Sequence, residues 1–282
     1  MPPCPRCHDP HTKKDGRTAR GQRYRCHGCR CTFTDRTGTP FAGYRWERDI
    51  IALAVHWYCS YRLSAANVRD LLAERGLDVA ARTVLTWVQT FGPLLGEAAR
   101  RRARPVGTRW WVDETYVRVK GKWAYLYRAI DEDGQVIDVL LREHRDLDSA
   151  KAFLAQAIER RGVMPTEVIT DGHQAYQRAV REEAPEAVHI VTGLHRAPGH
   201  PTTQPIECSH VPAKDRVRPM RGLQSIATGQ QLAEGLTVAQ AIRRGDVAVG
   251  GGGRPPGARP HQRARVVVAT FQWLAGELRL AS

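Results

Sequence analysis

Hydrophobic residues recur at helical spacing in the first third of the chain, after an N-terminal segment that has almost none. The first apolar stripe consists of Ile50, Ile51, Leu53, Ala54 and Trp57, and it predicts a helix. A second helix is expected over Ala65–Arg75, because Ser64 suits its N-cap position and Gly76 is placed to end it.

A third helix completes a short helical domain. It is expected to begin near Ala81 and to stop before Pro93, since proline removes a hydrogen bond inside a helix. Three helices with a tight connection predict a helix-turn-helix domain over residues 41–104, whose last helix would enter the major groove of DNA. Its candidate DNA contacts are Arg82, Thr83, Thr86 and Gln89. A helical spacer without DNA contact is the alternative.

After residue 105 the pattern changes to the alternation that is typical of strands. Three antiparallel strands are predicted over Trp110–Val112, Trp123–Ile130 and Val136–Leu141. They are followed by a helix over Ser149–Arg161 with Asp148 as its N-cap, a strand over Val168–Thr170, a further helix and a strand over Val188–Val191. The aromatic residues expected in the core of the sheet are Trp110, Trp111, Trp123 and Tyr125.

This order of elements predicts an α/β fold with an RNase H-like core, a mixed five-stranded sheet with helices, over residues 105–247. The remaining residues, 248–282, contain a glycine run at Gly250–Gly253 and then a segment without periodicity. We expect this tail to be irregular and disordered. Within it, Val266–Leu280 suits a terminal helix, although nothing in the sequence identifies its partner.

Residues 1–40 contain five of the seven cysteines and too few aliphatic residues for a hydrophobic core. Two residues separate Cys4 from Cys7 and Cys26 from Cys29, which is the spacing that brings four thiolates to one zinc ion. We therefore predict a zinc ribbon with one structural Zn²⁺. Cys31 is interpreted as a spare, because it lies too close to Cys29 to replace it easily.

The charge balance indicates a polyanionic partner. Lys and Arg number 43 against 29 Asp and Glu, for a net charge of +14, and nucleic acid is the obvious partner. A basic surface without a special ligand is the alternative. No stretch approaches the roughly 18 apolar residues that span a bilayer, so we expect a cytoplasmic, nucleoid-associated protein without membrane contact.

Two aspartates lie where oxygen ligands for a metal would be useful. Asp113 stands where an apolar strand turns polar, and Asp171 ends another strand beside Gly172. Magnesium prefers oxygen ligands, and two such ions about 4 Å apart stabilise both the entering and the leaving oxygen in phosphodiester cleavage. Because neighbouring side chains of a strand alternate faces, Glu114 is expected to point away from Asp113.

Several short stretches match a known family. They are Arg48-Asp49-Ile50-Ile51, Trp57-Tyr58, Leu71 to Gly76, Thr83-Val84, Trp87-Val88-Gln89, Val112 to Val117, Gly121 to Asp131, Thr170-Asp171, Ala175-Tyr176, Ile206-Glu207-Cys208 and His210. Through them the chain resembles the DDE transposases of bacterial and archaeal insertion sequences, in particular the "insertion sequence six" family, over roughly residues 41–245.

The resemblance implies a catalytic triad of Asp113, Asp171 and Glu207 that binds two Mg²⁺ ions, with Mn²⁺ as an alternative. It also implies that Lys214, which follows Glu207 by two helical turns, contacts terminal DNA. In this family the helix-turn-helix reads terminal inverted repeats in double-stranded DNA, and at least a homodimer pairs two ends.

The leading hypothesis is therefore a transposase that cleaves and joins DNA. Water would free a 3′-hydroxyl at the element end, and this hydroxyl would attack target DNA. The alternative is a catalytically degenerate DNA-binding protein that keeps the zinc ribbon and the helix-turn-helix. Pro212 and the irregular tail favour the alternative, because a proline inside a helix costs about 3 kcal/mol or kinks the helix, which would displace Lys214.

Overall fold

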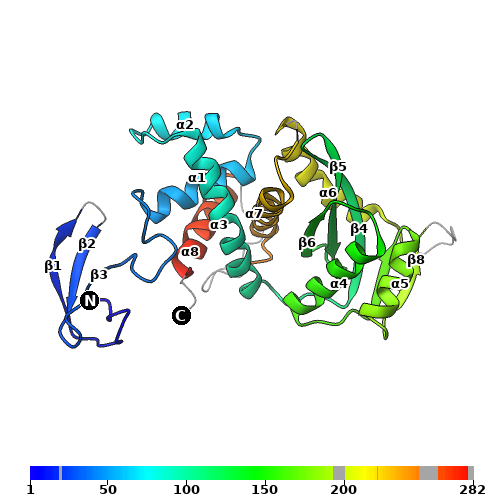
Figure 1. Ribbon diagram of the computed structural model, residues 1–282, viewed down its shortest axis with the longest axis horizontal. Coiled ribbons are helices and arrows are strands. Elements are labelled where there is room, and N and C mark those ends of the chain that lie inside the picture. Colours follow the sequence, from blue (N-terminus) through cyan, green and yellow to red (C-terminus); the bar gives the residue numbers. More distant parts are fainter. Residues whose placement is uncertain (19–20, 193–200, 221, 248–259, 279–282) are drawn as a thin grey trace.

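The computed structural model describes residues 1–18, 21–192, 201–220, 222–247 and 260–278. Along the chain these residues form a small N-terminal sheet, a group of helices, and a five-stranded sheet with helices packed on it (Figure 1). The two sheets lie at opposite ends of the molecule, with the helices between them. None of the helices in these ranges is long and apolar enough to cross a membrane.

The N-terminal sheet is small and mostly exposed. It consists of β1 (Thr12–Thr18), β2 (Gly21–Cys26) and β3 (Thr32–Thr34), paired antiparallel in that order. Its buried hydrophobic residues are Cys4, Cys26 and Phe33. A core of this size does not hold a sheet together by itself, so the segment needs another source of stability.

Three helices follow where the sequence predicted them: α1 (Arg48–Ser60), α2 (Ala65–Ala73) and α3 (Ala81–Arg101). Ser64 caps α2, because its side chain accepts a hydrogen bond from the backbone N–H of Asn67. The chain then turns at Gly76, whose φ of +73° is a conformation that glycine adopts without strain. This tight turn sets α3 against α1 and α2.

The predicted end of the third helix is wrong, because α3 continues through Pro93 to Arg101. Proline removes one backbone hydrogen bond there. Beyond it, Leu95, Ala98 and Ala99 are buried and belong to the main hydrophobic core. Their burial offsets the missing bond and keeps the last two turns helical.

The large sheet contains β4 (Arg109–Val119), β5 (Lys122–Ile130), β6 (Val136–Arg142), β7 (Glu167–Thr170) and β8 (Val188–Val191), with α4 (Leu147–Arg161) and α5 (Gln174–Glu183) between the later strands. The strand order is β6-β5-β4-β7-β8. The central β4 pairs antiparallel with β5 and parallel with β7, so the sheet is mixed. Both the order and the mixture are those expected of an RNase H-like core.

Two local expectations for this sheet are corrected. Asp146, not Asp148, caps α4, because its side chain accepts from the backbone N–H of Ser149 at 2.8 Å. Trp110 and Trp111 are buried as expected, but 55% of Trp123 is exposed. Trp123 lies beside the hairpin turn of β4 and β5, beyond the part of the sheet that α4 and α5 cover.

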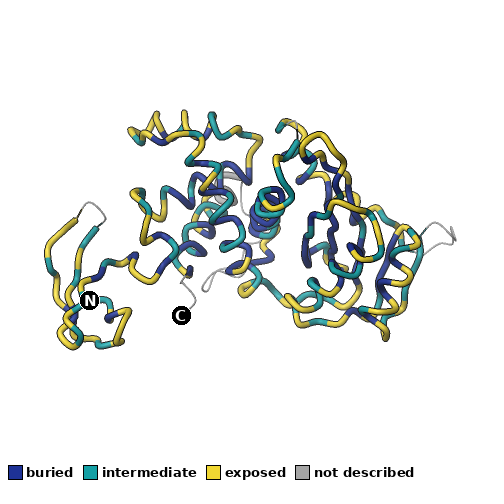
Figure 2. The backbone as a smooth tube through the Cα atoms, in the orientation of Figure 1, coloured by how far each residue is buried: buried dark blue, intermediate teal, exposed yellow. Residues whose placement is uncertain are grey.

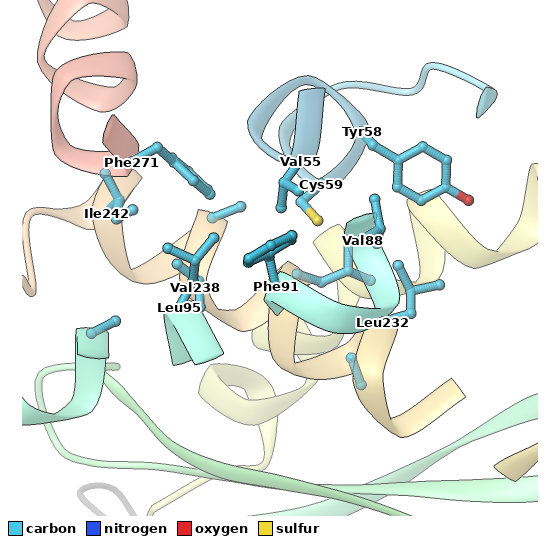
Figure 3. Packing of buried hydrophobic residues seen from close by; sticks show 14 of the residues in the cluster. Val55, Tyr58, Cys59, Val88, Phe91, Leu95, Leu232, Val238, Ile242 and Phe271 are labelled. Carbon is cyan, nitrogen blue, oxygen red and sulfur yellow. The ribbon is translucent and has the colours of Figure 1, made fainter. Parts of the chain in front are cut away.

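The second half of the molecule contributes α6 (Gln204–Val217), a short 3-10 helix η1 (Arg218–Met220) and α7 (Ile226–Arg244). Helix α7 packs against α1 and α3 on one side and against β6 on the other. One hydrophobic core therefore runs from Val55 and Phe91 in the helices through Leu232 in α7 to Leu141 in the sheet. Figure 3 shows this packing around Phe91 and Leu232.

Pro212 does not end α6, contrary to the expectation that it would disrupt this helix. The helix is anchored beyond the proline by Arg216, whose guanidinium donates to the backbone oxygens of Tyr58 and Leu63. Ala213, directly after the proline, is also buried. These contacts hold the last turns of α6 in place, so Lys214 remains on the helix.

The C-terminal tail is not irregular throughout. Residues Pro260–Glu277 form α8, and the predicted terminal helix finds its partner in α1. The side chains buried there are Phe271, Leu274, Ala275 and Leu278. The apolar face of α1 is wide enough to contact α8 as well as α3 and α7, and Figure 2 shows the buried residues concentrated where these helices meet. Residues 248–259 and 279–282 of the predicted tail lie outside the described ranges.

Candidate active site

Asp113 lies in β4, and Asp171 directly follows β7, the neighbouring strand of the large sheet. In the parallel register of β4 and β7, Trp111 faces Ile169. Continuing this register by two residues sets Asp113 beside Asp171, which directly follows the end of β7. Neighbouring strands are about 4.8 Å apart, so the fold brings the two carboxylates to one edge of β4.

Gly172 allows the chain to turn directly after Asp171. Its φ is +87°, and a Cβ atom added to it would lie 2.5 Å from Cγ1 of Val191. A larger residue would therefore both strain the backbone and clash with β8. The packing against β8 thus explains why the residue after Asp171 is a glycine.

Glu207 lies in the first turn of α6, which packs on β4 and β5. Three residues later on this helix, His210 places its Nε2 atom 3.3 Å from Oδ2 of Asp113. Residues three apart share one face of a helix and differ by about 4.5 Å in height. Glu207 is therefore about one turn from the contact between α6 and Asp113. Its Oε1 atom accepts a hydrogen bond from the Thr203 hydroxyl at 2.7 Å.

The three carboxylates do not form a single tight cluster. Among the described residues, the group of three or more metal-binding side chains with all ligand atoms within 4.8 Å of one another consists of cysteines. Ligands of two ions about 4 Å apart, each with bonds of about 2.1 Å, are separated by up to about 8 Å. A pair of hard cations can therefore be held by carboxylates that are too far apart to share a single ion.

The site also contains a buried polar layer that the sequence did not indicate. Glu114 points to the opposite face from Asp113, as expected, and contacts the Tyr176 hydroxyl and Arg145. Burial raises the pKa of Glu114, and burial also raises the pKa of Tyr176 well above its usual range. Arg145 also lies 3.0 Å from Oδ2 of Asp171, so one guanidinium contacts both carboxylates.

Arg128 is a second residue that sequence reasoning missed. It is directly opposite Asp113 in the register of β4 and β5, and it is 1% exposed. Its guanidinium donates to Oγ of Ser209 at 3.0 Å and to Oε1 of Gln240 at 2.8 Å. Both partners are neutral, and burial lowers the pKa of Arg128 to about 10. The visible signal was an arginine in the middle of an apolar strand.

The other candidate residues are spread over two further surfaces. Lys214 is half-buried on α6 and lines a groove beside β4. On α3, Arg82 and Thr86 are exposed, whereas Thr83 and Gln89 are half-buried. These four positions stay candidate DNA contacts, with Arg82 and Thr86 the most accessible.

The four predicted zinc ligands lie together at the N-terminal sheet. The Sγ atoms of Cys4, Cys7, Cys26 and Cys29 are all within 4.8 Å of one another, and Cys4 and Cys26 are buried. Cys31 is also close, with its Sγ atom 3.4 Å from that of Cys4 and 3.2 Å from that of Cys29. A tetrahedral thiolate site fits this cluster, and it would supply the stability that the small core lacks.

Comparison with known proteins gives relatives for the large sheet and its surroundings. A transposase for the insertion sequence-like element IS431mec of Staphylococcus aureus is 42% identical over 127 residues, which are 45% of this chain and 56% of the relative. A transposase for insertion sequence element IS257 in transposon Tn4003, also of Staphylococcus aureus, is 41% identical over the same shares. The chain thus spans about half the length of the curated relatives it matches.

Among solved structures, the catalytic core domain of BIV integrase aligns with a TM-score of 0.35 at 14% identity, over 52% of this chain and 91% of that chain. A family model described as a DDE domain matches residues 107–246, which contain all three candidate carboxylates. Residues 107–246 therefore form a DDE domain, and the chain is similar over part of its length to the DDE transposases of insertion sequences, in the "insertion sequence six" family.

Proposed function

We propose that the protein binds the terminal inverted repeats of an insertion sequence and catalyses DNA cleavage and strand transfer with Asp113, Asp171 and Glu207. The observation that carries the proposal is the convergence of two strands and one helix. Asp113 lies on β4, Asp171 directly follows the adjacent β7, and α6 contacts Asp113 one turn from Glu207.

In the proposed reaction, water attacks the phosphodiester at the element end, and the bond to the 3′-oxygen breaks, which leaves a free 3′-hydroxyl. This hydroxyl then attacks a target phosphodiester and displaces the target's own 3′-oxygen. Divalent ions held by the three carboxylates would stabilise the charge on the entering and leaving oxygens.

The surrounding side chains position the carboxylates. Burial lowers the pKa of His210, so the ring is neutral near pH 7, and its Nε2 atom lies 3.3 Å from Oδ2 of Asp113. Arg145 lies against Asp171 and compensates part of its charge. In this proposal Lys214, together with Arg82 and Thr86 on α3, contacts phosphates or bases of double-stranded DNA.

We also propose that Cys4, Cys7, Cys26 and Cys29 hold one structural zinc ion and that the active assembly is a dimer or larger. Each element end needs a set of carboxylates, so two ends joined in one complex need at least two chains. Assembly would bring two zinc ribbons and two helix-turn-helix domains to the paired ends.

The test is strand transfer in vitro. Purified protein with magnesium is expected to join a terminal-repeat duplex to a plasmid. Asp113→Asn should abolish joining and preserve binding of the duplex, whereas Asp148→Asn, at an exposed position of α4, should leave both unchanged. Joining that survives Asp113→Asn would refute the assignment. Binding without joining in magnesium or manganese by the unaltered chain would support the degenerate DNA-binding protein instead.

A further inference from the structure

A groove of about 440 Å³ lies beside the proposed triad, between the β4–β5 hairpin and the C-terminal half of α6. We call it the hairpin groove, and its lining includes Thr115, Tyr116, Arg118, Trp123, Lys214 and Arg218. β7 pairs with Arg109–Trp111, and the next backbone partner of β4 is Leu223, which bridges Val119 at the outer end of the strand. The groove lies beside the stretch of β4 between these two pairings. Figure 1 shows the hairpin rising beside α6.

Two aromatic rings of this groove are exposed to solvent. Tyr116 is 53% exposed and Trp123 is 55% exposed. Their ring centroids are 6.0 Å apart in an edge-to-face arrangement, and the guanidinium carbon of Arg118 lies 4.6 Å from the centroid of Trp123. Large aromatic side chains are usually buried, because removing their large apolar surface from water is strongly favourable. Here the hairpin holds a preformed aromatic surface in the open.

The groove is also positively charged. Arg118, Lys214 and Arg218 line it, and none of its described lining residues is acidic. Positive charge attracts phosphates, and exposed aromatic rings stack on bases. The combination of both in one groove is the chemistry that recognises nucleic acid with accessible bases.

We infer that the hairpin groove binds unpaired nucleotides of the DNA end, with a base stacked on Trp123 or Tyr116 and phosphates on Lys214 and Arg218. Stacking on a side chain requires an open base face, which paired and stacked bases do not offer, so the strand must be locally unpaired. The inference rests on the proposed function, because it takes the DNA end as the ligand.

The position of the groove fixes which nucleotides it would bind. Tyr116 follows Asp113 by three residues along β4, a distance of about 10 Å along the strand. Its side chain is on the face of Glu114, opposite to that of Asp113, because neighbouring residues of a strand alternate faces. A DNA strand that reaches from the carboxylates to this ring therefore passes around the open edge of the hairpin. Successive nucleotides of one strand rise about 3.4 Å each. The stacked base is therefore about three or more nucleotides from the phosphate that the carboxylates would cleave.

The experiment measures binding rather than joining. Terminal-repeat duplexes are prepared with the last three base pairs either matched or mismatched, and 2-aminopurine replaces one base in the mismatched stretch. We expect the chain to bind the mismatched end more tightly and to quench the 2-aminopurine fluorescence. Trp123→Ala should weaken binding to the mismatched end by about 5- to 150-fold, the effect typical of one lost stacking contact. Trp123→Phe should restore most of it.

The matched control is Trp46→Ala. It also removes a tryptophan ring that stacks with an arginine, since the guanidinium carbon of Arg45 lies 5.1 Å from the centroid of Trp46, and it lies away from the groove. It should leave the preference for mismatched ends unchanged. Equal affinity of Trp123→Ala and the unaltered chain for mismatched ends would overturn the inference. The inference would also be overturned if Trp123→Ala lost self-association without any change in DNA binding. The groove would then be a contact between copies of this chain.

The outcome is separable from that of the proposed function. If Asp113→Asn abolishes joining but Trp123→Ala leaves binding and fluorescence unchanged, the transposase proposal stands and the groove inference fails. If Trp123→Ala loses the mismatched end while Asp113→Asn still joins DNA, the groove inference stands and the catalytic assignment fails.

Discussion

His56 is a buried histidine at the junction of α1 and α8. It is 1% exposed, its Nδ1 lies 2.9 Å from Oγ of Ser60, and its ring packs 4.8 Å from that of Phe271. Burial, with a smaller contribution from Arg243, lowers its pKa to about 4. Because the unfolded chain titrates at 6.5, the unfolded state binds the proton first, and stability is lost as the pH falls from 6.5 to 4.

We predict that acid weakens this junction measurably. Between pH 7 and pH 5 the proton uptake at His56 should lower the free energy of unfolding by about 2 kcal/mol. Urea unfolding at the two pH values would measure it. In His56→Gln the difference between the two pH values should shrink by about that amount, whereas the exposed His27→Gln should retain it. If the free energy of unfolding changes between pH 7 and pH 5 by the same amount in His56→Gln as in the unaltered chain, burial does not lower the pKa of His56.

At this scale the sequence indicated the candidate carboxylates but not the residues that surround them. Asp113 was recognisable because it stands where an apolar strand turns polar, and Asp171 because it ends another apolar strand beside Gly172. Arg145 and Arg128 were not assigned, because their partners lie far away in the chain: Arg145 contacts Asp171, and Arg128 contacts Gln240. Such pairs are formed by the tertiary packing, and the local sequence pattern around each residue does not indicate its partner.

Among the elements, the N-terminal sheet should depend on metal. Cys26 is 1% exposed and is one of the three buried residues of this small core. We predict that Cys26→Ser, or a strong chelator, removes the zinc and unfolds β1, β2 and β3, because structural zinc supplies folding free energy directly. Metal content by mass spectrometry and amide hydrogen exchange of residues 1–36 would measure it, and the remaining helices should keep their protection.

Two cysteines serve as controls for the ligand set. Cys208→Ser changes an exposed cysteine on α6 and should leave the zinc content unchanged. Cys31→Ser should also retain zinc if Cys31 is a spare. Loss of zinc in Cys31→Ser together with retention in Cys29→Ser would exchange the roles of these two neighbours, whose Sγ atoms are 3.2 Å apart.

Element positions were predictable where the pattern was periodic, and the errors have a common cause. The sequence predicted a stop at Pro93 and a disrupted helix at Pro212, but both helices continue because buried residues beyond each proline anchor them. The helix over Val266–Leu280 had no assignable partner, since the face of α1 that receives it looks like any other apolar stripe. In each case long-range burial outweighs a local signal.

In the whole molecule, α7 connects the helices that would bind DNA to the sheet that carries the carboxylates. It meets α3 at two glycines, and a Cβ atom on Gly235 would lie 3.6 Å from Cα of Gly92. A Cβ atom on Gly92 would lie 3.0 Å from the backbone oxygen of Gln231, which cannot move without shifting α7. A side chain at Gly92 would therefore push the two helices apart by a few tenths of an ångström.

We predict that Gly92→Ala lowers the free energy of unfolding by about 1–3 kcal/mol, the cost typical of overpacking, although alanine is favoured over glycine inside a helix by about 1 kcal/mol. Gly276→Ala is the matched control in α8, where the nearest atom is the movable end of Arg48 at 3.4 Å, and it should be neutral or stabilising. Calorimetry would compare the two variants, and binding and strand-transfer assays would follow.

Because α7 is pushed away from α3 while each part keeps its own contacts, Gly92→Ala should bind terminal repeats normally but join them more slowly. A Gly92→Ala chain that is as stable as Gly276→Ala and joins DNA at the original rate would show that the tight contact between α3 and α7 does not couple the DNA-binding helices to the catalytic sheet.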